Sequence, residues 1–114
     1  MTAFDVGDIV SVEFPFSDLQ GRKRRPGLVL AADPNDALLA RLTTHAPRDS
    51  GEVALRHWAE SGLPKSSTIR LTKLAAVDRR LIHHRIGRLQ PEDAETVARA
   101  VETWLVELAA ALRK

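Results

Sequence analysis

The sequence predicts a mainly β fold, a small and strongly bent antiparallel barrel with one long C-terminal helix packed on it. The first two thirds of the chain consist of short apolar runs of strand length, interrupted every few residues by Gly, Pro, Asn or Asp. The last segment changes to the three-and-four spacing of a helix with one apolar face. The length of 114 residues, 44% hydrophobic and 28% charged, fits one domain over residues 1–114.

The strands are predicted from alternation and from the turn residues beside them. Val10, Val12, Phe14 and Phe16 alternate with polar residues, which is the period of a half-buried strand over 10–16. Pro26 opens a strand over 26–31, because proline is tolerated at the first residue of a strand. Further strands are predicted at residues 38–44, 53–55, 67–77 and 84–89, with one helical turn at 58–61 closed by Gly62.

The C-terminal helix is predicted to begin at Pro91 and to run for about 22 residues. Proline suits the first helical position, and the carboxylates of Glu92 and Asp93 complement the helix dipole there. One face is apolar to the end of the chain, through Ala94, Val97, Ala98, Val101, Trp104, Leu105, Leu108 and Leu112. We expect Leu105, Leu108 and Leu112 to extend beyond one small barrel and to pack against a second copy in a homodimer.

Several classes of protein and site are disfavoured. The chain has no Cys, which excludes disulfides, a thiol nucleophile and Cys-ligated metal centres. No run approaches the ~20 apolar residues of a membrane span, and the N-terminus lacks the pattern of a signal peptide, so we expect a cytoplasmic protein without membrane contact. Phosphate-cradling Gly loops and two-metal acidic clusters are missing, and adjacent His83 and His84 face opposite ways on a strand. We expect no metal and no cofactor.

Charge is unevenly distributed although Lys and Arg exceed Asp and Glu only by 17 to 15. Two basic groups stand out: Arg22, Lys23, Arg24 and Arg25, and later Arg79, Arg80, Arg85 and Arg88. Two such clusters favour a polyanion, and nucleic acid is the commonest one. Arg25 is held by Pro26 where a loop meets a strand, and Thr43, Thr44 and His45 end the 38–44 strand, so a sheet would bring them to the same rim.

Four motifs in order resemble the MazF/PemK family of toxin endoribonucleases. They are Gly7-Asp8-Ile9-Val10-Ser11-Val12-Glu13-Phe14-Pro15-Phe16 with the Arg25-Pro26 step, Ala40-Arg41-Leu42-Thr43-Thr44, Ser67-Thr68-Ile69-Arg70-Leu71-Thr72-Lys73, and Ile86-Gly87-Arg88-Leu89. The resemblance implies an SH3-like barrel, a homodimer and an mRNA interferase of a type II toxin-antitoxin pair. It implies metal-independent cleavage of single-stranded RNA, in which the ribose 2′-OH attacks the adjacent phosphorus.

The resemblance assigns Arg25 and Thr43 as the catalytic pair. A guanidinium holds two phosphoryl oxygens as charge grows on them, which suits Arg25. A threonine hydroxyl is too weakly acidic to be a good base unaided, so we assign Thr43 to positioning the 2′-OH. Thr44 takes that place if the strand register differs by one residue.

Further RNA contacts are expected around this pair, each with a structural alternative. They are Phe16 (base stacking or core), Lys23 and Arg24 (phosphate tethering), Thr44, His45 (proton transfer or an exposed loop), and Ser67 and Lys73 (cleft or strand surface). Phe14 is expected to pack in the core, Trp58 to cover the barrel or to stack on RNA, and Trp104 to lie in the core or in the dimer interface.

The expected partners are single-stranded RNA and a cognate antitoxin with an acidic tail that is disordered before binding. Two alternatives stay open: a non-catalytic SH3-like nucleic-acid-binding module, and a toxin of the same fold that poisons DNA gyrase.

Overall fold

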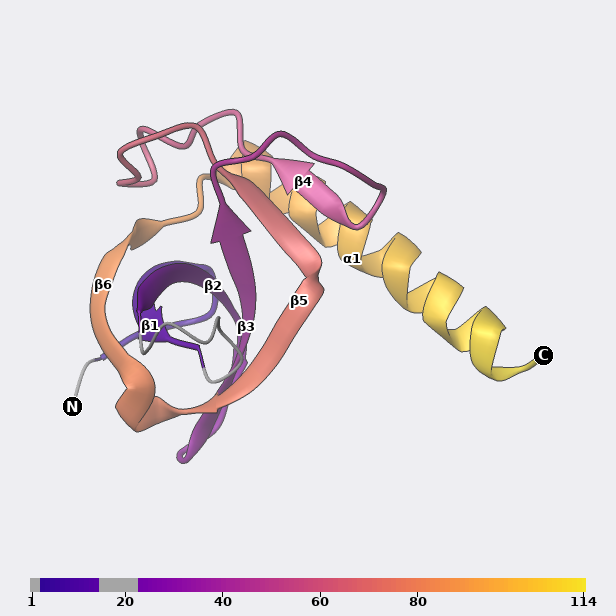
Figure 1. Ribbon diagram of the computed structural model, residues 1–114, viewed down its shortest axis with the longest axis horizontal. Helices are drawn as coiled ribbons and strands as arrows, with labels where there is room; N and C mark the ends of the chain where they lie inside the picture. Colours follow the sequence, from indigo (N-terminus) through magenta and orange to yellow (C-terminus); the bar gives the residue numbers. More distant parts are fainter. Residues whose placement is uncertain (1–2, 15–22) are drawn as a thin grey trace.

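The computed structural model describes residues 3–14 and 23–114, which form a curled sheet and one long helix (Figure 1). In order, the elements are β1 (Asp8–Glu13), β2 (Arg24–Ala32), β3 (Asp36–Thr43), β4 (Glu52–Ala54), β5 (Thr68–Asp78), a 3-10 turn η1 (Arg79–Leu81), β6 (Ile82–Arg88) and α1 (Pro91–Leu112). The mainly β prediction with a C-terminal helix is confirmed. The predicted end of the first strand at Phe16 and the predicted position of Arg22 lie outside the described residues.

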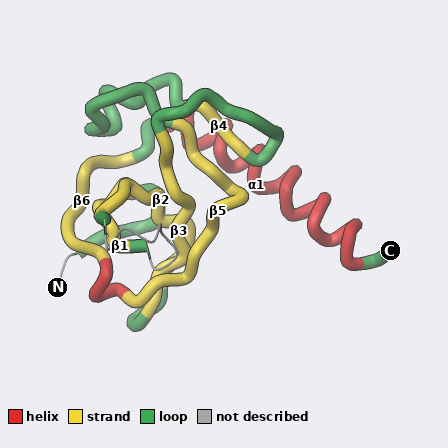
Figure 2. Tube along the Cα trace, viewed as in Figure 1, coloured by secondary structure: helices red, strands yellow, loops and turns green. Residues whose placement is uncertain are grey.

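The strands form one antiparallel sheet in the order β4-β5-β3-β2-β1-β6 (Figure 2). In the part of the chain that the structure describes, β4 does not pair with β6, so the antiparallel sheet is bent as predicted but is not closed into a barrel. The three-residue β4 reaches only the first part of β5, pairing Glu52 with Arg70. The η1 turn carries the chain from the other end of β5 to β1, where β6 pairs. The two edge strands therefore lie apart.

The largest register shift of the sheet is a bulge in β5. Ala40 of β3 pairs with Leu74, but the next residue, Arg41, pairs with Arg70. Three residues of β5, 71–73, therefore have no partner on β3. The backbone N–H of Leu71 donates instead to the Gly51 carbonyl, at 2.8 Å. A bulge increases the local twist and bends a strand, which accounts for the curl seen in Figures 1 and 2.

Apolar side chains bury both faces of the sheet in two clusters. The helix-side cluster contains Ile9, Leu28, Ala40, Leu42, Val53, Leu55, Leu63, Ile69, Leu71 and Val97, with Trp58 and Trp104 packed against it. The far-side cluster contains Phe4, Val10, Val12, Phe14, Val29, Ala37, Leu39, Val77 and Ile82. β1 is thus buried on both faces, because Ile9 belongs to one cluster and Val10 to the other. The prediction of a half-buried strand over 10–16 is wrong in this respect, whereas core packing of Phe14 is confirmed.

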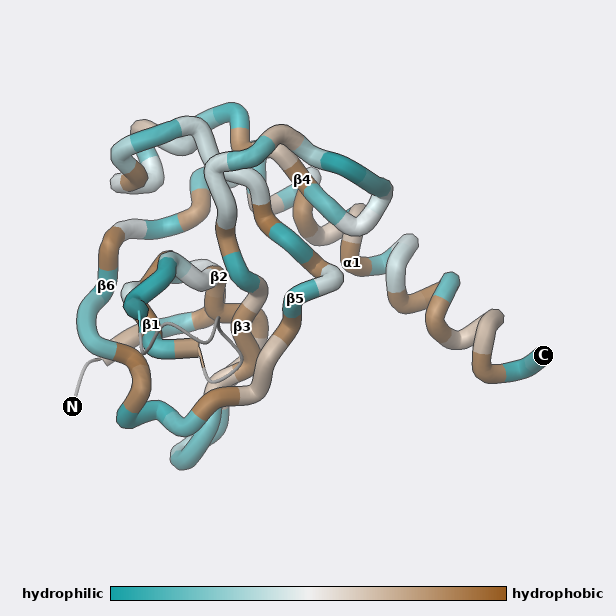
Figure 3. Tube along the Cα trace, viewed as in Figure 1, coloured by the Kyte–Doolittle hydropathy of each residue, from teal (hydrophilic) through white to brown (hydrophobic). Residues whose placement is uncertain are grey.

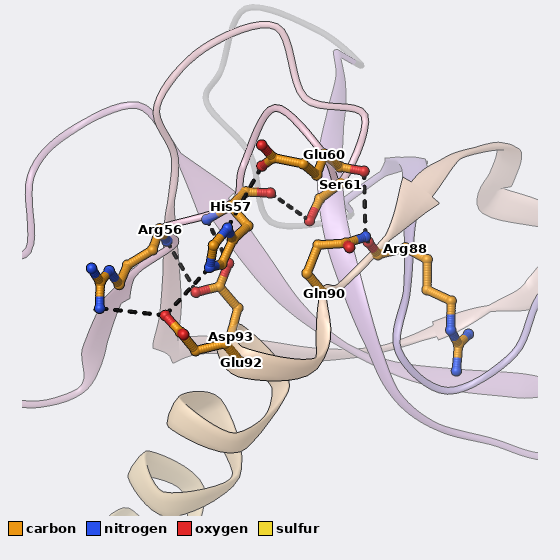
Figure 4. Close-up of polar contacts among 8 residues, drawn as sticks. All are labelled: Arg56, His57, Glu60, Ser61, Arg88, Gln90, Glu92 and Asp93. Carbon is orange, nitrogen blue, oxygen red and sulfur yellow. Dashed lines mark hydrogen bonds and ion pairs between the residues drawn. The ribbon is translucent and has the colours of Figure 1, made fainter.

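The start of α1 is fixed to the turn over residues 56–62 (Figure 4). The buried Asp93 carboxylate accepts hydrogen bonds from the backbone N–H groups of Arg56 (3.0 Å) and His57 (2.8 Å). The Ser61 N–H and hydroxyl both donate to the His57 carbonyl. Gly62 closes the turn with φ +92°, a left-handed conformation that favours glycine. The predicted single turn and the predicted helix start are both confirmed.

α1 packs on the helix-side cluster only as far as Trp104. Val97 is buried, but Leu105 is 54% exposed and Leu112 is 87% exposed. The helix extends away from the sheet, and apolar residues continue along it to the end (Figures 1 and 3). The expectation that α1 packs on the sheet is therefore correct as far as Trp104, and not for the last residues of the helix. No described helix is long and apolar enough to cross a membrane.

Candidate functional site

Arg25 and Thr43 lie at the same end of two neighbouring strands. Gly27 of β2 pairs with Arg41 of β3. Continuing that antiparallel register by two residues along each strand brings Arg25 opposite Thr43. Alternate residues of a strand share a face, so both side chains lie on the face of the far-side cluster. Both residues are half-buried.

Hydrogen bonds fix the chain where β3 ends. The Thr43 hydroxyl accepts a long hydrogen bond, 3.5 Å, from the His45 backbone N–H. Thr68, which pairs with Thr43 across β3 and β5, is buried, and its hydroxyl donates to the His45 carbonyl at 2.6 Å. Two threonines therefore hold the His45 backbone from neighbouring strands. Sequence reasoning did not single out Thr68, although it lies inside the third motif.

Gly27 leaves room for an aromatic ring beside Arg25. A Cβ atom built on Gly27 would lie 3.0 Å from Cζ of Phe14 and 3.3 Å from Cγ1 of Val12. Any side chain there would have to displace the Phe14 ring. Arg25 lies two residues before Gly27 on the same face, so the close approach of Phe14 to Gly27 lies next to the position of Arg25 on β2.

The predicted RNA contacts separate into two groups. Lys23, Arg24, Thr44, His45 and Lys73 are exposed, the first two beside Arg25 and the next two directly after Thr43. Lys73 lies in the β5 bulge. Ser67 is different, because it is 5% exposed and its hydroxyl donates to the Lys65 carbonyl at 2.8 Å. We therefore interpret Ser67 as a turn residue. Phe16 lies outside the described residues.

One carboxylate near this end of the sheet is held by two donors. Glu52, 7% exposed, accepts from the Arg48 backbone N–H (2.9 Å) and from Nε of Arg70 (2.8 Å). The Arg48 hydrogen bond and then the Arg70 guanidinium lower the pKa of Glu52. Glu52 therefore stays ionised and attaches β4 to β5. No sequence pattern indicates this pair, because its members are 18 residues apart.

The second basic group is paired with carboxylates and carbonyls. Arg80 forms an ion pair with Asp78 at 2.9 Å, and its hydrogen bonds lower the pKa of Asp78 to about 2. Arg85 and Arg88 both contact Asp8, at 3.1 and 2.9 Å. Asp8 and Asp78 therefore offset part of the positive charge of this group, which the sequence alone does not indicate.

The two adjacent histidines have different surroundings. His83 contacts Glu13 at 2.9 Å, whereas His84 is exposed. Among the described residues, no three His, Asp or Glu side chains gather in a way that would hold a metal ion.

Several solved structures from mycobacteria have a similar fold. An endoribonuclease from a mycobacterial species, solved in complex with its cognate antitoxin, superposes with a TM-score of 0.74 at 16% identity, covering 90% of this chain and 95% of that chain. The Mycobacterium tuberculosis toxin MazF-mt6 superposes with a TM-score of 0.69 at 20% identity, covering 84% of this chain and 93% of that chain. At these identities the likeness establishes the fold. A search of curated proteins found no match.

The family is established by the sequence itself. The model of the PemK-like, MazF-like toxins of type II toxin-antitoxin systems matches residues 5–105, nearly the whole chain. The match includes both strands that carry Arg25 and Thr43. The chain therefore belongs to the PemK-like, MazF-like toxin family.

Proposed function

We propose that this protein is a toxin endoribonuclease that cuts single-stranded RNA without a metal ion. The observation that carries the proposal is the register of β2 and β3, which brings Arg25 and Thr43 to the same face at the same end of the sheet. A phosphodiester lying across these strand ends would meet a guanidinium and a hydroxyl together. A module that only binds RNA needs the cations but not this pairing.

The reaction requires no water nucleophile. The ribose 2′-oxygen forms a bond to the adjacent phosphorus and loses its proton, while the bond to the 5′-oxygen breaks and that oxygen gains a proton. The products are a 2′,3′-cyclic phosphate and a 5′-hydroxyl. DNA lacks the 2′-OH and is not a substrate.

Arg25 stabilises the charge that grows on the phosphoryl oxygens. Two parallel N–H···O bonds fit a guanidinium to two of those oxygens, and such donors act most strongly in the transition state. Thr43 orients the 2′-OH, because its hydroxyl is already held in place by the His45 backbone. The exposed His45 side chain, two residues further on, is our candidate for moving a proton.

The exposed Lys23 and Arg24 side chains extend the site along the RNA backbone. We propose that the same cations bind the acidic tail of an antitoxin, which then occupies the RNA path. Such a tail is disordered before it binds. We also propose a cytoplasmic homodimer in which α1 of each copy covers the exposed Leu105, Leu108 and Leu112 of the other.

The test is cleavage of a long unstructured RNA by the purified protein in EDTA, followed by chemical mapping of the cut ends. The proposal predicts cleavage with a 2′,3′-cyclic phosphate and a 5′-hydroxyl at every cut. The same sequence as DNA is the matched control and should stay intact. Cleavage that needs added magnesium, or that leaves 5′-phosphates, would contradict the proposal. Intact RNA would favour a non-catalytic binding module.

A further inference from the structure

A basic pocket lies beside the beginning of β1, away from the cleavage residues. It has a volume of about 560 Å³ and is lined by Phe4, Asp5, Asp8, Arg79, Arg85 and Arg88. On β1, Val12 pairs with Arg25 of β2, and Asp8 lies four residues before Val12. At the rise of a β-strand this separation is about 13 Å. Whatever binds in the pocket therefore does not occupy the position between Arg25 and Thr43.

Two arginines share one carboxylate oxygen in this pocket. Oδ1 of Asp8 lies 3.1 Å from Nε of Arg85 and 2.9 Å from Nη1 of Arg88. Oδ2 accepts a hydrogen bond from the Asp5 backbone N–H at 2.8 Å. The Asp8 side chain is 4% exposed, whereas those of Arg85 and Arg88 are 51% and 52% exposed. One buried negative charge thus orients two guanidiniums that remain half open to solvent.

The third arginine lies over an aromatic ring. The guanidinium carbon of Arg79 lies 4.2 Å from the centre of the Phe4 ring, and its Nη1 donates to the Asp33 carbonyl at 3.0 Å. Phe4 itself is 9% exposed and belongs to the far-side cluster. The ring and the carbonyl hold Arg79 in one orientation at low entropic cost, and a guanidinium plane is a surface on which nucleobases stack.

The charges of the pocket favour a phosphate. Three guanidiniums face two carboxylates, those of Asp5 and Asp8, which leaves one excess positive charge. Arg85 and Arg88 each contact Asp8 through one nitrogen, and a guanidinium has three nitrogens that carry donors. A tetrahedral phosphate accepts hydrogen bonds from several directions at once. Two arginines that share one carboxylate can donate hydrogen bonds to it from two of those directions.

We propose that this pocket binds a phosphate group of single-stranded RNA outside the cleaved step, with Arg85 and Arg88 on the phosphate oxygens and Arg79 beneath a neighbouring base. The inference rests on the proposed function insofar as it takes RNA to be the ligand. The pocket adds affinity for long RNA, and it makes no contact with the reacting atoms. A nucleotide chain has to reach it from the Arg25 end, so short RNA leaves it empty.

The experiment measures binding of a 2′-O-methyl oligoribonucleotide, which cannot be cut by 2′-OH attack, over a series of salt concentrations. Arg85→Gln and Arg79→Gln should each weaken binding about 3- to 10-fold. Loss of the Arg85 contact should also make the slope of log affinity against log salt shallower by about 0.7. Arg79→Gln leaves both ion pairs of Asp8 in place, so its result stands even if Arg85→Gln disturbs the fold.

Arg80→Gln is the matched control. Arg80 is the neighbour of Arg79, is 87% exposed and pairs with Asp78 outside the pocket, so its loss should leave affinity and slope nearly unchanged. A dinucleotide with a 2′-O-methyl group has a single phosphodiester and cannot span the about 13 Å between the cleaved step and the pocket, so when bound at the cleaved step it should bind wild type and Arg85→Gln equally.

Three results would overturn the proposal. The first is a loss of RNA affinity in Arg85→Gln and Arg79→Gln that is no larger than the loss in Arg80→Gln. The ion pairs of the pocket would then have a structural role only. The second is binding of a nucleoside monophosphate as tightly as the oligonucleotide, which would make it a small-molecule site. The third is a loss of affinity for an oligoglutamate peptide in Arg85→Gln while the affinity for RNA is unchanged, which would make the pocket a site for an acidic peptide. Because the RNA used is uncleavable, failure of the cleavage proposal is read separately, in the EDTA assay.

Discussion

Gly27 and Phe14 are packed so closely that a Cβ atom on Gly27 would lie 3.0 Å from the tip of the Phe14 ring. The backbone of Gly27 does not require a glycine, because among the described residues only Gly7 and Gly62 have a positive φ. It is the approach of the ring that requires a residue without a side chain. Because Arg25 lies two residues away on the same face, this contact links core packing to the position of the guanidinium.

Gly27→Val should therefore lower both stability and activity. Forcing extra carbons into a filled site costs roughly 1–3 kcal/mol in free energy of unfolding. We expect cleavage to fall further than stability explains, because the strand carrying Arg25 is displaced. Urea unfolding and single-turnover cleavage measure the two effects. As a control, Ala32→Val changes an exposed residue at the other end of β2 and should alter neither. If Gly27→Val is less stable but cleaves RNA at the wild-type rate, the packing of Phe14 on Gly27 does not affect the position of Arg25.

Asp93→Ala should destabilise the protein by about 2–3 kcal/mol. The substitution leaves two backbone N–H groups, those of Arg56 and His57, without their buried carboxylate acceptor. The neighbouring Glu92 is the control, since its exposed side chain contacts Arg56 and His57 only at the surface, and Glu92→Ala should cost less than about 1 kcal/mol. Thermal unfolding of both variants gives the comparison. Equal losses would mean that Asp93 does not hold α1 to the turn.

Glu52 should contribute acid-sensitive stability. Its pKa is lowered in the folded protein, so its stabilising contribution is present above the ordinary carboxyl pKa of 4.5 and is lost as the pH falls through the lowered folded value. Glu52→Gln should be less stable than wild type at pH 7, and the difference should shrink below about pH 4. Glu95→Gln, at an exposed position on α1, should show no such convergence. A difference that stays constant from pH 7 to pH 3 would contradict the ion-pair account.

Sequence reasoning was most successful where structure depends on neighbouring residues. Pro91 with its following carboxylates defined the helix start, and Gly62 defined the end of the single turn. It failed where distant segments meet. The β5 bulge leaves no pattern in residues 71–73, since an alternating strand and a bulged one contain the same residue types. The positions of β4 and β6 relative to each other could not be predicted either, because they depend on how strands far apart in the sequence pair.

The candidate site shows the same division. The position of Arg25 and Thr43 at one rim followed from strand ends alone, and the structure places them accordingly. The burial of Ser67 and the role of Thr68 depend on hydrogen bonds to Lys65 and His45, which no spacing rule contains. Arg88 was counted as a surface cation, but its partner Asp8 lies 80 residues earlier.

The exposed apolar half of α1 should form a dimer interface. Leu105, Leu108 and Leu112 recur at helical spacing and are 42–87% exposed in one copy. Leu108→Lys should convert a dimer to a monomer in sedimentation at micromolar concentration. Glu107→Lys, one residue away on the same exposed helix, controls for added positive charge and should leave the dimer intact. A wild-type protein that sediments as a monomer would refute the interface.

The central claim is that Arg25 and Thr43 act together on one phosphodiester, and a double-mutant cycle tests it most directly. Single-turnover cleavage is measured for wild type, Arg25→Ala, Thr43→Ala and the double variant, with unfolding curves to verify that each folds. We expect losses of about 10³-fold for Arg25→Ala and about 10²-fold for Thr43→Ala, and a double variant little slower than Arg25→Ala alone. Near-normal cleavage by Arg25→Ala, or losses in the double variant that multiply as for independent sites, would contradict the account.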